Sequence, residues 1–192
     1  DRARAQLRSL RQRVTLSRVS VSIEPGRDAA AKDSGWTLGD AVRDALDAAK
    51  ITVGDSADEI LGRPAFTFAN ERRELNLVVL SVAALGFVAD GGTLADIHAR
   101  AVRLGFELCP EEVGPQLRLQ YLNQPVGEFL HVAMKPQLTY RGDPVDFTLA
   151  NGGAGLSLLG GSARPNLVIS SRAAACAQLV FAQTDRMAEP HR

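Results

Sequence analysis

The chain has few residues of the types that build metal or catalytic sites, and they are widely spaced. Its three histidines, His98, His131 and His191, lie far apart in the sequence. A zinc protease instead places two histidines one helical turn apart. A metal site assembled in space from His98, His131 and Cys109 is one interpretation, and separate structural histidines are the other. We expect the second and predict no bound metal.

Cys109 stands directly before Pro110, and proline is common at the first position of a helix. A thiol at a helix N-terminus can have a lowered pKa, which makes it a nucleophile. Glu111 and Glu112 follow at once, however, and their charges would oppose ionisation of the thiol. We therefore expect Cys109 to be a buried, small apolar residue. With Cys176 as the second cysteine of the chain, we predict two separate thiols rather than a disulfide.

Glycine-rich loops and paired carboxylates give no catalytic assignment either. The segment NGGAGLSLLGG, residues 151–161, has the glycines of a phosphate-binding loop but no following Lys-Ser or Lys-Thr. It is more typical of a hairpin turn. The GxSxG motif of serine hydrolases is absent. Pairs such as Glu111 with Glu112 and Asp143 with Asp146 are ordinary in caps and turns. We predict no catalytic residue and no cofactor.

Composition indicates an ordinary globular protein. The 192 residues are 45% hydrophobic and 23% charged, with a net charge of zero. No run of 18 apolar residues predicts a membrane span, and the first 20 residues lack the apolar stretch of a secretory signal. We therefore expect a cytoplasmic protein that does not contact a membrane.

The charge is uneven along the chain and suggests four segments. Residues 1–27 carry seven arginines against Asp1 and Glu24, so they form a basic N-terminal arm. Small and polar residues predict a linker or loop over 28–35. We expect a single α+β domain over 36–183 and a tail over 184–192.

Capping signals predict a helical core. Residues 71–85 begin after Asn70, an N-cap type, and stop at Gly86. Residues 94–104 follow Thr93, with Asp96 three positions later as in a capping box, and stop at Gly105. A third short helix is predicted over 115–122, starting at Pro115.

Alternating apolar residues after Pro125 predict strands. Phe129, His131 and Ala133 would face one side, and Leu130, Val132 and Met134 the other. Four short strands at close spacing predict a small antiparallel sheet. The predicted fold class is therefore α+β, with a helical core followed by that sheet. We expect the centre of this core to contain Leu80, Val82, Ile97, Leu104, Leu117, Leu119 and Val132.

Three helices followed by strands is also the order of a winged helix, a helix-turn-helix-like arrangement. Its third helix would present Gln116, Arg118 and Gln120 to DNA bases, and these side chains suit that role. The basic arm would add phosphate contacts through Arg4, Arg8 and Arg11. Against this, residues 70–124 carry five basic and seven acidic groups, which makes a poor phosphate-binding surface.

The stretch LCPEEVGPQLRLQY, residues 108–121, resembles a recurrent core of uncharacterised bacterial proteins. The preceding ADIHARAVRLGFE and the following NQPVGEFLHVAMKP extend this resemblance. It covers about residues 36–150 and is strongest over 94–136. It implies that 36–181 folds as one unit. It implies no activity and therefore transfers no catalytic residue.

The missing catalytic motifs and the well-capped helices favour a binding module without enzymatic activity. We expect a protein partner or a small ligand rather than nucleic acid. A DNA-binding winged helix is the first alternative. An enzyme with a site assembled from sequence-distant residues, among Cys109, His98 and His131, is the second.

Overall fold

The protein was analysed as a computed structural model. The arginines predicted to contact phosphates, Arg4, Arg8 and Arg11, lie outside the described residues, as do the predicted loop over 28–35 and tail over 184–192. The structure describes residues 18–23, 38–66, 69, 72–89, 91–174 and 176–183.

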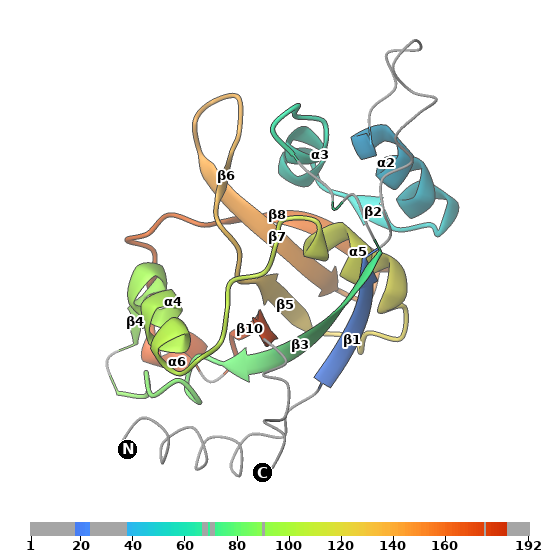
Figure 1. Cartoon of the computed structure of the whole chain (residues 1–192). Helices are drawn as coiled ribbons and strands as arrows, with labels where there is room; N and C mark the ends of the chain where they lie inside the picture. The colour runs from blue at the N-terminus through green and yellow to red at the C-terminus, as the bar shows by residue number, and fades with distance from the viewer. Residues whose placement is uncertain are drawn as a thin grey trace, which may run out of the picture.

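Within these residues the dominant element is one mixed sheet of eight strands (Figure 1). A separate two-stranded sheet pairs β4 (Gly92–Thr93) with β9 (Val168–Ile169). The strands of the large sheet are β1 (Arg18–Ile23), β2 (Thr52–Val53), β3 (Arg73–Ser81), β5 (Phe129–Val132), β6 (Gln137–Leu138), β7 (Pro144–Asn151), β8 (Leu156–Ser162) and β10 (Gln178–Gln183).

The strand order of the large sheet is β1-β3-β10-β5-β7-β8-β2, and β6 pairs with β7 beside this path. The pairs β10–β5 and β2–β8 are parallel, and the others are antiparallel. Sequence-distant strands therefore meet at its centre. The helices are α2 (Leu38–Ala48), α3 (Asp55–Leu61), α4 (Leu94–Arg103), α5 (Val113–Gln120) and α6 (Ser171–Ala174).

The sheet has a hydrophobic core on each face. On β3, Leu77 belongs to a first core, and Val78 and Leu80 belong to a second. Successive strand residues point to opposite faces, so we call the face with Leu77 the first face and the face with Val78 the second. Figure 1 shows α2, α3 and α5 together at the upper right of the sheet and α4 and α6 at its lower left.

The first core contains a tightly packed pair of aromatic rings. Phe147 on β7 is fully buried and meets Phe66 edge to face, with ring centroids 5.9 Å apart. It also lies against α5 at Gly114, where a Cβ atom would stand only 2.4 Å from the Phe147 ring. Glycine is therefore required at this point of the helix. Val113 and Leu117 of the same helix are buried in this core.

The predicted helical core is wrong, because the molecule is dominated by its sheet. Residues 71–85 were predicted as a helix, but Arg73–Ser81 form strand β3. The strand pairs with β1 on one side and β10 on the other. Since both of its faces are buried, its apolar residues run on without alternation, and such a run is ambiguous between helix and strand.

The winged-helix arrangement is not formed. Helices α4 and α5 exist near their predicted positions, although α5 starts at Val113, two residues before Pro115. The buried residues of α4 belong to the second core, whereas those of α5 belong to the first. The two helices therefore lie on opposite faces of the sheet and cannot pack as a helix-turn-helix pair.

The cap of α4 and most of the core residues were predicted more accurately than the fold class. Thr93 caps α4 by accepting a hydrogen bond from the backbone N–H of Asp96 at 3.1 Å. Six of the seven predicted core residues are buried, and Leu119 is half-buried against the first core. None of the helices in the described part of the chain is long and apolar enough to cross a membrane.

Candidate functional site

A polar cluster lies on the second face of the central strands β5, β7 and β8. On β7, Asp146 and Thr148 are buried and point away from the first core, which holds their neighbour Phe147. His131 on β5 pairs directly with Thr148, so its side chain is on the same face. Gly161 on β8 pairs with Asp146. The register of three strands therefore brings these four residues together.

The three side chains converge beside Gly161. Thr148 Oγ1 and His131 Nδ1 are hydrogen-bonded at 3.0 Å. A Cβ atom on Gly161 would lie 2.6 Å from Asp146 Oδ1, 2.8 Å from Thr148 Oγ1 and 3.7 Å from His131 Nδ1. Any side chain at this position would collide with the carboxyl and the hydroxyl group. Glycine thus allows both groups to lean over the neighbouring strand.

Asp146 has unmet hydrogen-bonding capacity. Its side chain is 4% exposed, and Oδ1 has no hydrogen-bond partner among the described residues. Burial raises the pKa of Asp146 to about 8, and a hydrogen bond from its own backbone opposes this only in part. Burial also lowers the pKa of His131. At neutral pH the cluster therefore holds an uncharged imidazole and a mostly protonated carboxyl group.

On the second face the cluster lies next to the second core, which includes Ala133 and Ala163, two residues beyond His131 and Gly161. Among the described helices, α3 and α5 contact β7 and β8, and their buried residues belong to the first core. The large sheet contributes to the second core through β3 and β10. Phe129, on the same face as His131, is 46% exposed. The cluster thus consists of polar side chains on the sheet surface, beside a partly exposed aromatic side chain.

The residues predicted to read DNA do not share one exposed surface. On α5, Gln120 is exposed, but Gln116 is buried and Arg118 has no exposed surface. Arg118 donates hydrogen bonds to Gln124 Oε1 and to the Tyr121 carbonyl oxygen. In this arrangement its guanidinium cannot reach a base edge.

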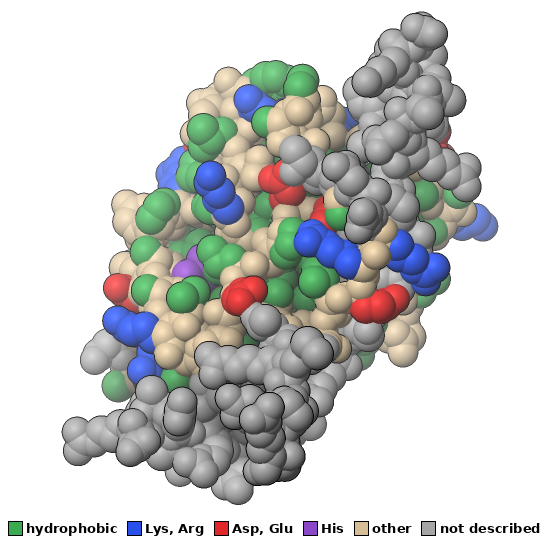
Figure 2. Space-filling view, in the orientation of Figure 1, with side chains coloured by type: hydrophobic (Ala, Val, Ile, Leu, Met, Phe, Trp, Pro, Cys, Tyr) green, Lys and Arg blue, Asp and Glu red, His purple; other side chains and the backbone are tan. Residues whose placement is uncertain are grey.

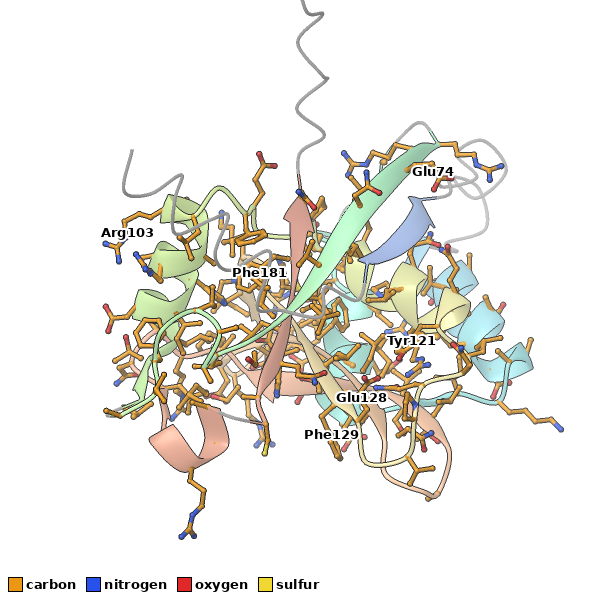
Figure 3. The ribbon with its side chains drawn as sticks, turned by 90° about the horizontal axis from the view of Figure 1, so that it is seen from below. Glu74, Arg103, Tyr121, Glu128, Phe129 and Phe181 are labelled. Atoms are coloured by element: carbon orange, nitrogen blue, oxygen red, sulfur yellow. The ribbon has the colours of Figure 1, made fainter. Side chains whose placement is uncertain are left out.

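The Arg118 contacts form a structural network under the end of α5. Gln124 donates in turn to the carbonyl oxygens of Glu128 and Leu149, at 3.1 and 3.2 Å. Tyr121 lies beside Glu128 (Figure 3), and burial together with a hydrogen bond to Glu128 raises the pKa of the phenol. The network thus ties the loop after α5 to β7.

Cys109 and His98 are not part of the sheet-face cluster. Cys109 lies in the first core, its Sγ contacts the Val180 carbonyl oxygen at 3.4 Å, and burial raises its pKa to about 12. His98 packs edge to face on Phe181, with ring centroids 6.1 Å apart, and its buried Nε2 has no partner in the described part of the chain. Within the described ranges, no group of three or more His, Cys, Asp or Glu side chains could hold a metal ion.

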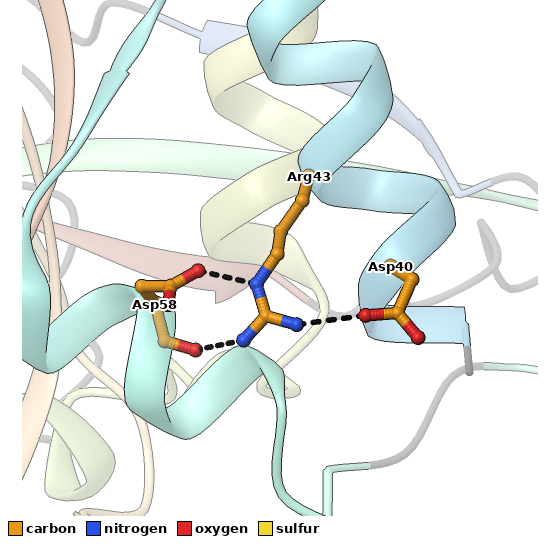
Figure 4. A network of polar contacts seen from close by, with 3 residues as sticks. All are labelled: Asp40, Arg43 and Asp58. Atoms are coloured by element: carbon orange, nitrogen blue, oxygen red, sulfur yellow. Dashed lines mark hydrogen bonds and ion pairs between the residues drawn. The ribbon is translucent and has the colours of Figure 1, made fainter. Parts of the chain in front are cut away.

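A hollow elsewhere on the molecule is lined by charged side chains, and its arginine is already paired. Between α2, α3 and β2 an open hollow of about 480 Å³ is lined by Lys50 and Arg43, among others. Arg43 bonds Asp58 and also contacts Asp40 at 3.0 Å (Figure 4). It also donates to the Asp58 carbonyl oxygen. Because the guanidinium is occupied on every nitrogen, this hollow has less to offer a ligand than the sheet-face cluster.

Asp146 and Thr148 were missed as site residues. The signal for them is their alternation with Val145, Phe147 and Leu149, which places two polar side chains on one face of an otherwise apolar strand. The sequence alone does not reveal that His131 and Gly161 lie beside them. No protein-family model, curated protein or solved structure matches the chain.

Proposed function

We propose that the chain is a binding module without enzymatic activity, which takes a small polar ligand on the second face of the sheet. The site is the cluster of Asp146, Thr148, His131 and Gly161. The single observation that supports it is the buried Oδ1 of Asp146, which has no partner among the residues that the structure describes. A buried polar atom without a partner is costly and rare in folded proteins, and a ligand would satisfy it.

The surroundings suit a ligand better than a structural role. Asp146 is a buried polar residue whose hydrogen-bonding capacity the fold leaves unused, since its Oδ1 has no partner among the described residues. Pockets for small ligands combine apolar walls with a few converging polar groups. Here Phe129 provides an apolar wall, and the carboxyl, hydroxyl and imidazole groups provide the polar contacts.

A small ligand is favoured over nucleic acid by the distribution of charge. Figure 2 shows Lys and Arg side chains interspersed with Asp and Glu over the side of the molecule that it presents. Binding to phosphates relies on several cations gathered on one surface. The cluster itself carries no cationic side chain.

Fragment screening by ligand-observed NMR on the full chain tests the proposal. We expect fragments whose binding is lost in both Asp146→Leu and Gly161→Ala, because the second variant puts a methyl group against the carboxyl group. Asp143→Leu is the matched control, since Asp143 is half-buried, pairs with Arg164 at 2.9 Å and lies outside the cluster. Fragments that bind all three variants as well as the wild type would contradict the proposed site.

One observation favours a second candidate, an acyl-transfer enzyme. The Thr148 hydroxyl is hydrogen-bonded to His131 Nδ1, and a hydroxyl next to a neutral imidazole is the arrangement of an activated nucleophile. Turnover of a small activated ester would then disappear in Thr148→Val and persist in Cys109→Ala. If the wild type and Thr148→Val show the same rate, this candidate is excluded.

A further inference from the structure

The hydrogen-bonding capacity left unused in the cluster consists mainly of acceptors. Asp146 Oδ1 has no partner among the described residues, and once the carboxyl group is ionised it can only accept hydrogen bonds. When the Thr148 hydroxyl donates to His131 Nδ1, the lone pairs of its oxygen stay free. A ligand that fits both atoms must bring N–H or O–H groups.

The chain supplies no counter-charge for Asp146 within the described residues around it. Burial raises its pKa, and no neighbouring cation lowers it. His131, the titratable side chain that faces it from β5, is neutral because burial lowers its own pKa. Arg164 stands outside the end of β8 and pairs with the equally peripheral Asp143. A cationic ligand would supply the missing positive charge beside Asp146.

The burial of the cluster limits the size of the bound group. Because Asp146 and Thr148 are only 4% and 5% exposed, a group that contacts them must be compact. An ammonium group is compact and carries three donors. Phe129, on the same face and 46% exposed, offers apolar surface for the rest of the ligand.

We propose that the ligand is a primary amine with a short apolar body, whose ammonium group donates hydrogen bonds to Asp146 Oδ1 and Thr148 Oγ1. This inference rests on the proposed function, because it names the ligand class of the same site. Binding of the cation converts the protonated carboxyl group into a carboxylate. One proton is therefore released to solvent for each amine bound when the pH lies below the pKa of Asp146.

Benzylamine, its near-isostere benzyl alcohol and the anion benzoate are the test probes. We measure binding to the full chain by calorimetry at about pH 6.5, in buffers of different ionisation enthalpy, to count released protons. We expect benzylamine to bind about 10-fold more tightly than benzyl alcohol, since a charge-assisted hydrogen bond is stronger than a neutral one. Close to one proton should be released, and affinity for the amine should rise with pH towards about 8.

Two variants separate this inference from the proposed function. Asp146→Asn should lose both the proton release and the preference for the amine, while Asp143→Asn should keep both. If benzyl alcohol or benzoate binds best and still depends on Asp146, the site stands but the amine is the wrong ligand class. If an amine preference persists without proton release in both variants, the ammonium group does not contact Asp146. If no probe binds in a way that depends on Asp146, the inference is wrong.

Discussion

On β7, Val145, Phe147 and Leu149 face the first core, while Asp146 and Thr148 face the other way. The first group is covered by helices α3 and α5, and Phe147 has no exposed surface. The second group is polar and buried on the face that carries the second core. One face of this strand is tightly packed, so its residues can be replaced only by side chains of similar shape. The other face carries polar groups whose hydrogen-bonding capacity the fold does not fully use.

The two faces also differ in the hydrogen-bond partners of their buried ionisable side chains, Arg118 and Asp146. Arg118, beside the first core, donates to Gln124 and to the backbone of Tyr121, although its Nε lacks a partner. Asp146 Oδ1 has no partner among the described residues. A network that links helix, loop and strand serves the fold, whereas an isolated acceptor over a glycine is available to a ligand.

Replacing Phe147 with Ala should have the largest effect on stability. The change removes a fully buried ring and its contact with Phe66, and leaves a cavity under α5. We expect a loss of about 3–5 kcal/mol in the free energy of unfolding. Phe129→Ala, on the other face, should cost less than about 1 kcal/mol because Phe129 is half exposed. Urea unfolding of both variants measures the contrast, and equal losses would show that the two faces are packed alike.

Replacing Arg118 with Met should have the next largest effect. The side chains have similar lengths, but the change leaves Gln124 Oε1 and the Tyr121 carbonyl oxygen without donors. We expect a loss of about 2–4 kcal/mol. Gln120→Ala on the exposed side of α5 is the control and should change stability by about 0.5 kcal/mol or less. A neutral Arg118→Met would mean that the network does not stabilise the loop after α5.

How far the sequence predicts this molecule depends on how local each signal is. Helix α4 was predicted because its start and stop are encoded by Thr93, Asp96 and Gly105, within one segment. Strand β3 was missed because its apolar run is explained by pairing with β1 and β10, which are distant in the sequence. Tertiary pairing overrode the local cap at Asn70, which itself lies outside the described residues.

The candidate site was harder to predict, because it depends on register. His131 was correctly expected on a strand, facing away from Leu130 and Val132. Its neighbour Thr148 is 17 residues further on, and Gly161 is further still. A shift of one residue in either pairing would turn these side chains to the opposite face. Such registers are fixed by packing and turns together, which a single sequence does not display.

Replacing Asp146 with Asn should have an effect of opposite sign, a gain in stability at high pH. Because the folded pKa of about 8 lies above the ordinary value of 3.8, the folded state holds more protons than the unfolded state between these two values. Stability of the wild type should therefore fall as pH rises through this window. Asp146→Asn removes this dependence, so its stability relative to the wild type should increase through the window and level off above pH 8. Thermal unfolding across pH measures it, and a parallel pH profile for both proteins would show that Asp146 is ionised without penalty.

The smallest expected effect concerns the two thiols, and it is measured as the rate at which they react with a disulfide reagent. Cys109 lies in the first core with its pKa raised to about 12 by burial, whereas Cys176 is exposed after α6. Only a thiolate attacks a disulfide reagent, so at about pH 8 the native protein should react rapidly at one thiol. Cys176→Ser should abolish this fast phase, and Cys109 should react only when the protein unfolds. A fast phase that survives in Cys176→Ser would mean that the first core opens readily. The first core would then be less tightly packed than the complete burial of Phe147 indicates.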